Sequence, residues 1–394
     1  MIKIINGNSL EELKKFPDNY FHSVVTDPPY GLSFMGKKWD YDVPSVELWQ
    51  EVFRVLKEGG YLLSFAGTRT QHRMAVNIED AGFEIRDMIA WVYGSGFPKS
   101  HNIGKAIDKL QGNEREVVGK RDWNDPMAKP YTNKHYGGER IRDDIPMEVT
   151  KGNSEWEGWG TALKPALEPI TMARKPFKGT VANNVLKNGV GGINIDGCRV
   201  EYKNEQDKKE GQSERNTTSK GHFATQLKDD KFNRSDRSEI TGRFPANFIH
   251  DGSDEVKDLL EESSRFFYGA KASKQDRNEG LEDFDEKEAF AMSGGDFKEK
   301  LSTNHTTGKT LKQNHHPTVK PTDLMRYLIR LVTPKEGIVL DCFMGSGSTG
   351  KACALEGFNF VGIDLDKDYC EIAKARIDKA IEEKRIMDSQ TKLF

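Results

Sequence analysis

Residues 338–350 of this chain, IVLDCFMGSGSTG, decide its fold. The apolar run Ile338, Val339 and Leu340 predicts a short buried strand. The glycines that follow it allow a sharp turn and a close approach of the backbone to a ligand. A helix is expected from about 349 to 356. The stretch therefore predicts a strand, a glycine-rich turn and a helix in succession.

A second strand, Phe360 to Asp364, is expected after this helix. Asp364 lies 19 residues after Gly345. In Rossmann-type folds an acid near this spacing binds the ribose hydroxyls of a nucleoside. The pattern predicts a β-α-β unit with a nucleoside site, and a purely structural turn is the alternative.

Two other interpretations of the turn compete with this one. Residues 345–351, GSGSTGK, fit the first part of a P-loop, but the Ser or Thr that should follow to bind Mg²⁺ is Ala352. A dinucleotide-dependent dehydrogenase would also place glycines here, yet it gives the middle positions of GSGSTG no special meaning. Neither interpretation uses the motif near the N-terminus.

That motif is Asp27-Pro28-Pro29-Tyr30, directly after an expected strand at 21–26. The Asp27 carboxylate and the Pro28 carbonyl can accept hydrogen bonds from an exocyclic NH2 group, and Tyr30 can stack on a flat ring. Pro28 and Pro29 fix φ and offer no competing N–H donor. An ordinary Pro-Pro turn after a strand is the alternative.

Together the two motifs suggest methyl transfer from a sulfonium donor to an aromatic amine, a reaction that needs no metal. Hydrogen bonds from the NH2 group to Asp27 and Pro28 would favour a pyramidal nitrogen whose lone pair points at the methyl carbon. A base within a duplex must first be flipped out, and Tyr30 would then stack on it.

The alternation of strands and helices at both ends of the chain predicts an α/β fold. We expect a doubly wound, mostly parallel, Rossmann-like sheet with helices on both faces. Its catalytic half is expected at 1–104 and its cofactor-binding half at 313–394. An irregular insertion for target recognition is expected at 105–312, of which 164–175 returns one strand to the core.

Several local elements are also predicted. Ser9 is expected to cap the first helix in a capping box with Glu12. Helical spacing at 46–57 is expected to stop at Gly59 and Gly60. The further expectations are strands at 3–5, 61–65 and 85–93, helices at 69–80 and from Pro321, a closing helix through Ile381, and a mobile loop at 281–314.

Composition bounds the class of protein. The chain has 394 residues, 31% charged and 36% hydrophobic, with a net charge of −3. It contains no apolar run of about 18 residues, so no membrane span is expected. Four cysteines without C-x-x-C spacing favour reduced thiols and a cytoplasmic location over disulfides or a zinc site. Residues 99–142 carry a balance of +4, and residues 250–301 a balance of −7.

Three motifs, taken in their order along the chain, resemble those of the β-class DNA amino-methyltransferases that use S-adenosylmethionine, including phage- and prophage-type members. They are Asp27–Tyr30, residues 316–321 (HPTVKP) and residues 341–349 (DCFMGSGST). The resemblance implies that Asp27, Pro28, Pro29 and Tyr30 form the catalytic loop. The residues that it assigns to cofactor binding are Asn8, Thr318, Lys320, Asp341, Phe343, Gly345, Gly347 and Asp364.

Within that set, Asp364 would hold the ribose hydroxyls, and Thr318 and Lys320 the methionine end, where Lys320 suits a carboxylate. Asn8 would lie near the adenine of the cofactor. The alternatives are a solvated lysine at Lys320, a plain loop residue at Thr318 and turn chemistry at Asn8. No metal site is expected, because His315 and His316 lack companions at ligand spacing.

We therefore expect a site-specific methyltransferase that modifies double-stranded DNA. Adenine N6 is favoured over cytosine N4, because in this family an Asp at position 27 accompanies adenine more often. A catalytically idle DNA-binding protein is a further alternative, and a homodimer remains open. Basic residues of the insertion would contact phosphates: Lys105, Lys109, Arg115, Lys120, Arg121, Arg140 and Arg142.

Overall fold

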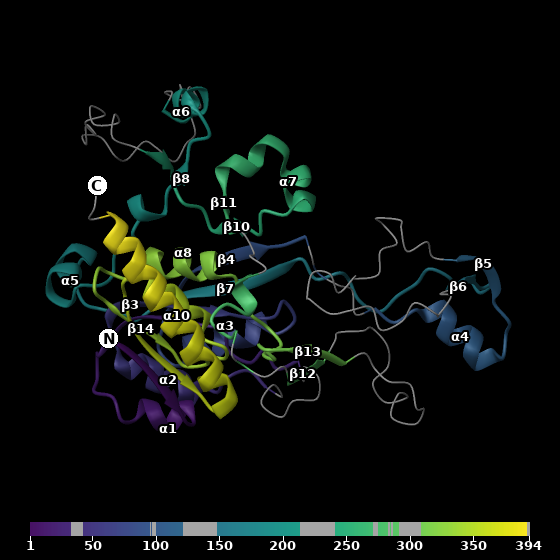
Figure 1. The fold of residues 1–394 in the computed structure, drawn as a ribbon, viewed down its shortest axis with the longest axis horizontal. Helices are drawn as coiled ribbons and strands as arrows, with labels where there is room; N and C mark the ends of the chain where they lie inside the picture. The colour runs from purple at the N-terminus through teal and green to yellow at the C-terminus, as the bar shows by residue number, and fades with distance from the viewer. Residues whose placement is uncertain are drawn as a thin grey trace.

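The structure, a computed structural model, describes residues 1–32, 42–94, 96, 100–120, 148–212, 241–270, 275–282, 284, 287–290 and 309–391. Its centre is a nine-stranded sheet with the order β1-β15-β14-β2-β3-β7-β4-β10-β11 (Figure 1). Every ladder of this sheet is parallel except the two made by β7. In sheet order the strands are Ile2–Asn6, Asn359–Asp364, Ile338–Asp341, Phe21–Thr26, Leu56–Phe65, Leu167–Arg174, Glu84–Val92, Phe248–His250 and Tyr268–Gly269.

Helices cover both faces of the sheet. Neighbouring strand residues such as Val24 and Val25 point to opposite faces, so they belong to two separate apolar clusters. One cluster packs the sheet against α1 (Ser9–Leu13), α2 (Val46–Val55) and α3 (Gln71–Asp80). The other packs it against α8 (Thr322–Val332), α9 (Ser348–Glu356) and α10 (Lys367–Thr391). The predicted doubly wound, Rossmann-like α/β fold is confirmed.

The cap of α1 differs from the prediction. Asn8, not Ser9, is the N-cap residue, and its Oδ1 accepts from the amides of Leu10 and Glu11. Ser9 lies one position later and donates its hydroxyl to the Cys342 carbonyl at 2.5 Å. Both side chains are good caps, but the Ser9 hydroxyl bonds to the Cys342 carbonyl and does not cap the helix.

The expected stop at Gly59 and Gly60 was also wrong. α2 ends at Val55, and β3 begins at once and includes both glycines. Gly59 has φ +82°, and a Cβ there would clash with Asn184 of α5 (Val181–Asn188), whose Nδ2 donates to the Glu58 carbonyl at 3.0 Å. Gly59 therefore serves the close packing of β3 on α5 rather than a turn.

The expected strand at 164–175 is confirmed as β7. The rest of 105–312 holds more regular structure than predicted, and β10 and β11 from this region extend the main sheet. Its other helices and strands are α4 (Ile103–Gln111), β5 (Glu116–Lys120), β6 (Glu148–Lys151), α5 (Val181–Asn188), η4 (Asp196–Cys198), β8 (Val200–Glu201), α6 (Glu205–Gln212), β9 (Gly242–Arg243), α7 (Asp254–Leu260), η6 (Glu261–Phe266) and η7 (Gln275–Arg277).

The predicted mobile loop at 281–314 contains an antiparallel ladder. β12 (Lys287–Phe290) pairs with β13 (Lys309–Lys312). Residues 283, 285–286 and 291–308 of this loop lie outside the described residues. The sequences of β12 and β13 show no alternation of apolar and polar residues, so the sequence gives no strand signal here.

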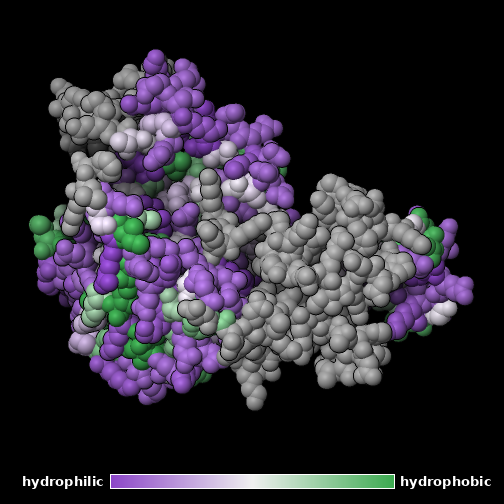
Figure 2. Space-filling view, in the orientation of Figure 1, coloured by the Kyte–Doolittle hydropathy of each residue, from purple (hydrophilic) through white to green (hydrophobic). Residues whose placement is uncertain are grey.

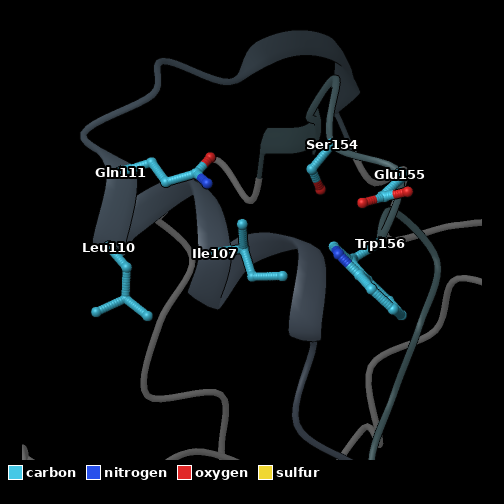
Figure 3. Close-up of a pocket in the computed structure, with 6 residues that line it drawn as sticks. All are labelled: Ile107, Leu110, Gln111, Ser154, Glu155 and Trp156. Atoms are coloured by element: carbon cyan, nitrogen blue, oxygen red, sulfur yellow. The ribbon is translucent and has the colours of Figure 1, made fainter.

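α4, β5 and β6 form a small unit beside the main sheet, at the right of Figure 1. Arg115 holds it together, because its guanidinium pairs with Asp108 and with Glu157 Oε1 at 2.7 Å and donates to the Thr150 carbonyl at 3.1 Å. Arg115 is thus engaged inside the unit rather than open to phosphates. A shallow pocket here (Figure 3) is lined by Ile107, Leu110, Gln111, Ser154, Glu155 and Trp156.

Of the other predicted phosphate contacts, Lys105 and Lys109 are exposed on α4. Arg121, Arg140, Arg142 and the side chain of Lys120 lie outside the described residues. Figure 2 shows that hydrophilic residues dominate the described surface of this face, with hydrophobic ones in smaller patches. Within the described part of the chain, we find no helix with the length and apolar character needed to cross a membrane.

Candidate active site

The topology brings the two predicted motifs to one edge of the sheet. β1, β15, β14 and β2 are parallel neighbours, so their carboxyl ends lie together. Asn8, Asp364, Asp341 and Asp27 stand at or just after these ends. This edge is where open α/β sheets bind ligands.

β7 adds a residue that the sequence analysis did not single out. Because β7 runs antiparallel to β3 and β4, its first residues lie at the carboxyl ends of its neighbours. Glu168, its second residue, therefore joins the same edge as Asp27. An acid at the start of an apolar strand is a signal in the sequence, but its meaning depends on the direction of the strand.

Asp27, Tyr30, Glu168 and Lys320 form one hydrogen-bonded group, which we call the catalytic cluster. The Lys320 ammonium lies 2.6 Å from Asp27 Oδ2, 3.1 Å from Glu168 Oε2 and 3.3 Å from the Tyr30 hydroxyl. Tyr30 donates its hydroxyl to Asp27 Oδ1 at 2.7 Å. Lys320, predicted for the methionine end of a cofactor, is in this structure the counter-ion of the predicted catalytic acid.

The surroundings of the cluster explain its electrostatics. Burial by itself lowers the pKa of Lys320, but the negative charges of Asp27 and Glu168 outweigh it and raise the pKa well above the ordinary value. Burial, with the charges of Asp27 and Glu168, raises the pKa of Tyr30. Burial, with the negative charge of Glu168, likewise raises the pKa of Tyr93 to about 12. Both tyrosines thus stay protonated at neutral pH.

Asp341 joins the strand of the catalytic loop to the strand of the glycine-rich loop. It is buried, and its carboxylate accepts from Thr26 Oγ1 at 2.7 Å, the Phe343 amide at 3.1 Å and Thr349 Oγ1 at 2.5 Å. Burial raises the pKa of Asp341 to about 6, although these hydrogen bonds lower it. Thr26 directly precedes Asp27, so Asp341 holds the two motifs in fixed register.

The glycine-rich loop turns back onto the end of β15. The Gly345 amide donates to Asp364 Oδ2 at 2.7 Å, and burial raises the pKa of Asp364. Gly345 and Gly347 have φ of +51° and +79°, and a Cβ on Gly347 would lie 2.7 Å from that of Ala373. The loop therefore requires glycine at both positions, for conformation and for space.

These residues fit the donor that the motifs predict. The loop brings backbone amides to the strand edge without side chains, and Asp364 offers a carboxylate suited to ribose hydroxyls. Phe343 is half-buried beside the loop. The side-chain oxygen of Asn8 caps α1, and Thr318 is exposed. The binding roles of all of these residues remain predictions.

His316 is a loop residue that lies against the glycine-rich loop. Its Nδ1 bonds to the Thr318 carbonyl at 2.5 Å, and its ring packs edge-on against Tyr369. Burial lowers the pKa of His316 to about 4, so the ring is neutral at physiological pH. A Cβ on Gly345 would lie 2.7 Å from His316 Nε2, which shows how closely the two segments approach.

Two buried cations on the helices also support the loop. Arg376 of α10 donates to the Ser346 carbonyl at 2.5 Å and to the Asp276 carbonyl at 2.5 Å. Lys351 of α9 pairs with Glu279 and lies 3.6 Å from Asp276 Oδ1. A P-loop lysine would instead reach a phosphate. The engagement of Lys351 therefore argues against the P-loop interpretation.

Comparison with known proteins agrees with this geometry. Residues 21–375 match the family model of the DNA methylases that methylate N6 or N4 amino groups. The chain belongs to this family. Its members are DNA amino-methyltransferases that use S-adenosylmethionine, which is the cofactor of this chain.

Individual relatives are more distant. The type II methyltransferase M.HindIII of Haemophilus influenzae is 26% identical over 235 residues, which is 48% of this chain and 64% of that protein. M1.MboII of Moraxella bovis is 40% identical over 82 residues, 21% of this chain and 29% of that protein. The chain thus spans less than two thirds of the length of these curated relatives.

Solved structures cover nearly the whole chain at low similarity. The M1.HpyAVI–SAM complex has a TM-score of 0.40 and 17% identity, and covers 95% of this chain and 100% of its own. The cytosine-N4-specific PvuII DNA methyltransferase has a TM-score of 0.41 and 14% identity, and covers 97% of this chain and 90% of its own.

Proposed function

We propose that this protein transfers the methyl group of S-adenosylmethionine to the exocyclic amine of a base in double-stranded DNA, with adenine N6 as the acceptor. One observation carries the proposal. The 2.7 Å hydrogen bond from Thr26 to Asp341 places the Asp27 loop beside the glycine-rich loop, although 315 positions separate the two residues in sequence. An acceptor amine and a methyl donor can therefore meet at one strand edge.

In this function Asp27 and the Pro28 carbonyl accept the two N–H groups of the amine, and the ring of Tyr30 stacks on the base. These contacts hold the nitrogen in line with the methyl carbon, and positioning of this kind is a large part of such catalysis. The donor supplies an activated methyl group when bound. Asp364, Asn8, Thr318 and Lys320 are the residues proposed to hold it, together with Phe343 and the loop of Gly345 and Gly347.

The preference for adenine rests on Asp27, since members of this family with Asp at this position act mostly on adenine. Residues 105–312 are proposed to form the recognition region, and residues 1–104 and 313–394 the two halves of the methyltransferase domain. Lys105 and Lys109, exposed on α4, are proposed to contact phosphates and to make DNA binding depend on salt.

The test is transfer of a labelled methyl group to genomic DNA, followed by digestion to nucleosides. Label in N6-methyladenine supports the proposal, whereas label in N4-methylcytosine corrects the base. DNA binding without label points to an idle DNA-binding protein, and ATP turnover without label to a hydrolase.

Asp27→Ala identifies the catalytic acid. It should abolish methyl transfer and leave donor affinity nearly intact by calorimetry. Its fold should survive, because Lys320 keeps Glu168 as its partner at 3.1 Å. Asp80→Ala, at an exposed position on α3, is the matched control. Equal losses of transfer and donor affinity would count against the role of Asp27.

A further inference from the structure

Glu168 occupies a position in the catalytic cluster for which the motifs provide no role. It stands on the one antiparallel strand of the main sheet, and its Oε2 lies 3.1 Å from Lys320 and 3.3 Å from the Tyr30 hydroxyl. Only about a fifth of the side chain is exposed. Glu168 is therefore a fixed second carboxylate beside the predicted catalytic acid.

Lys320 is enclosed as well as paired. An ammonium has three N–H donors, and among the described residues Asp27, Glu168 and the Tyr30 hydroxyl are acceptors near Lys320. The side chain is 8% exposed, and Nζ lies 4.9 Å from the centre of the Phe65 ring. A buried ammonium that loses its counter-ion is strongly destabilised. Lys320 must therefore keep a carboxylate partner at every step.

Both carboxylate oxygens of Asp27 already accept a hydrogen bond in this arrangement. Its Oδ1 accepts from Tyr30 at 2.7 Å, and its Oδ2 accepts from Lys320 at 2.6 Å. Each oxygen can accept a second hydrogen bond, but the ammonium at 2.6 Å draws electron density from Oδ2 and so weakens this oxygen as an acceptor for an N–H of the target base. Without Glu168, a Lys320 ammonium released by Asp27 would have no second carboxylate of the catalytic cluster to pair with. With Glu168 present, the ammonium moves from one carboxylate to another that it already contacts.

We propose that Glu168 is a positioning residue that takes over the Lys320 ammonium and so frees one oxygen of Asp27 for the amine of the target base. This inference rests on the proposed function, because it assigns Asp27 the role of holding the acceptor amine. Glu168 itself touches neither base nor donor in this scheme. Its effect on the reaction passes through Lys320.

The test compares single-turnover methyl transfer and donor affinity in Glu168→Gln, Glu168→Asp and the wild type. Glu168→Gln removes the charge and keeps the shape, so it should slow transfer about 10- to 100-fold while donor affinity changes less than about 3-fold. Glu168→Asp keeps the charge and should restore most of the rate. Glu371→Gln, at an exposed position on α10, is the control.

A double-mutant cycle shows whether Glu168 acts through Lys320. In a Lys320→Met background the ammonium is gone, so Glu168→Gln should change the rate less than about 2-fold. If Lys320→Met leaves no measurable rate, Glu168→Asp decides. Recovery to within about 3-fold of the wild type supports the proposal, and a rate equal to that of Glu168→Gln overturns it.

Other outcomes are equally decisive. Unchanged transfer in Glu168→Gln, a loss confined to donor affinity, or the same loss with and without Lys320 would each overturn the role of Glu168. The wild type separates this inference from the proposed function. If the wild type transfers no label to DNA, the proposed function fails. If it transfers label and Glu168→Gln equals it, only the inference fails.

Discussion

Replacing Asp341 with asparagine should reveal the cost of burying its charge. Asp341 is 2% exposed and accepts hydrogen bonds from Thr26, Phe343 and Thr349. An asparagine keeps the shape, and its Oδ1 can still accept from Thr26 and Phe343. The hydroxyl of Thr349 can rotate to accept from Nδ2. The variant thus loses the charge and retains most of the bonding that joins β2 to β14.

The magnitude follows from the pKa of Asp341. Burial raises it to about 6 in the folded protein from an ordinary value of 3.8. Between these pH values the folded protein binds a proton that the unfolded chain has released, so stability falls as pH rises through this window. Above about pH 6 both states are ionised, and the full cost of about 3 kcal/mol is present. About half of it develops between pH 5 and pH 8.

The assay is urea unfolding of the wild type and Asp341→Asn at pH 5, 6, 7 and 8. The free energy of unfolding of the variant, minus that of the wild type, should grow by about 1.5 kcal/mol over this range. Any imperfect hydrogen bond in the variant adds a term that does not depend on pH. Asp80→Asn, at an exposed position, should show no such growth. A difference that stays flat or shrinks from pH 5 to pH 8 would refute the reasoning.

Two further substitutions, with Gly357→Ala as a control, test the packing of the glycine-rich loop and the ion pair of the helix that follows it. Gly347→Ala puts a side chain at φ +79° and a Cβ 2.7 Å from that of Ala373. It should lower the free energy of unfolding in urea by about 3 kcal/mol or more. Gly357→Ala is the control, because Gly357 has a similar φ of +82° but no atom within 4 Å of an added Cβ. It should lower the free energy of unfolding by about 1 kcal/mol, and an equal loss in the two variants would contradict the packing argument. Lys351→Met leaves Glu279 without its buried partner and should cost about 3 kcal/mol in stability. Its donor affinity by calorimetry should stay within about 3-fold, and a large loss would return the P-loop interpretation to consideration.

The cofactor-binding end of the fold was the easiest part to predict, because its signals are local. The expected strand before the glycine-rich loop, the helix after it and the strand ending at Asp364 match β14, α9 and β15 to within one or two residues. Glycines at positive φ and apolar runs act within a few residues of the chain. These local signals predict the elements without knowledge of contacts from elsewhere in the fold.

Local signals failed where a distant contact decided the outcome. Ser9 and Asn8 are both good caps, and only the Cys342 carbonyl, 333 positions away, removes Ser9 from that role. Gly59 and Gly60 resemble a helix stop in sequence, but both lie within β3, and α5 packs on Gly59. β10 has three residues and β11 has two, so both strands are too short to show a hydrophobic period.

The candidate site shows the same division in its chemistry. Asp27 and Tyr30 belong to a compact motif and were singled out from sequence. Glu168 was passed over, although the strand around it was expected, because its place depends on β7 running antiparallel. A reversed β7 would carry Glu168 to the opposite edge of the sheet. Strand direction is set by pairing with β3 and β4, which no pattern within 164–175 encodes.

The strand order also explains how a large insertion can separate the two halves of one site. β2 and β14 are hydrogen-bonded neighbours, so the Asp27 loop and the glycine-rich loop share an edge whatever lies between them in sequence. β7, β10 and β11 extend the sheet only on the far side of β3. Length and sequence elsewhere in 105–312 can therefore change without moving β2 against β14. Glu168 reaches back from the insertion into the catalytic cluster, so we expect its loss to act on Asp27.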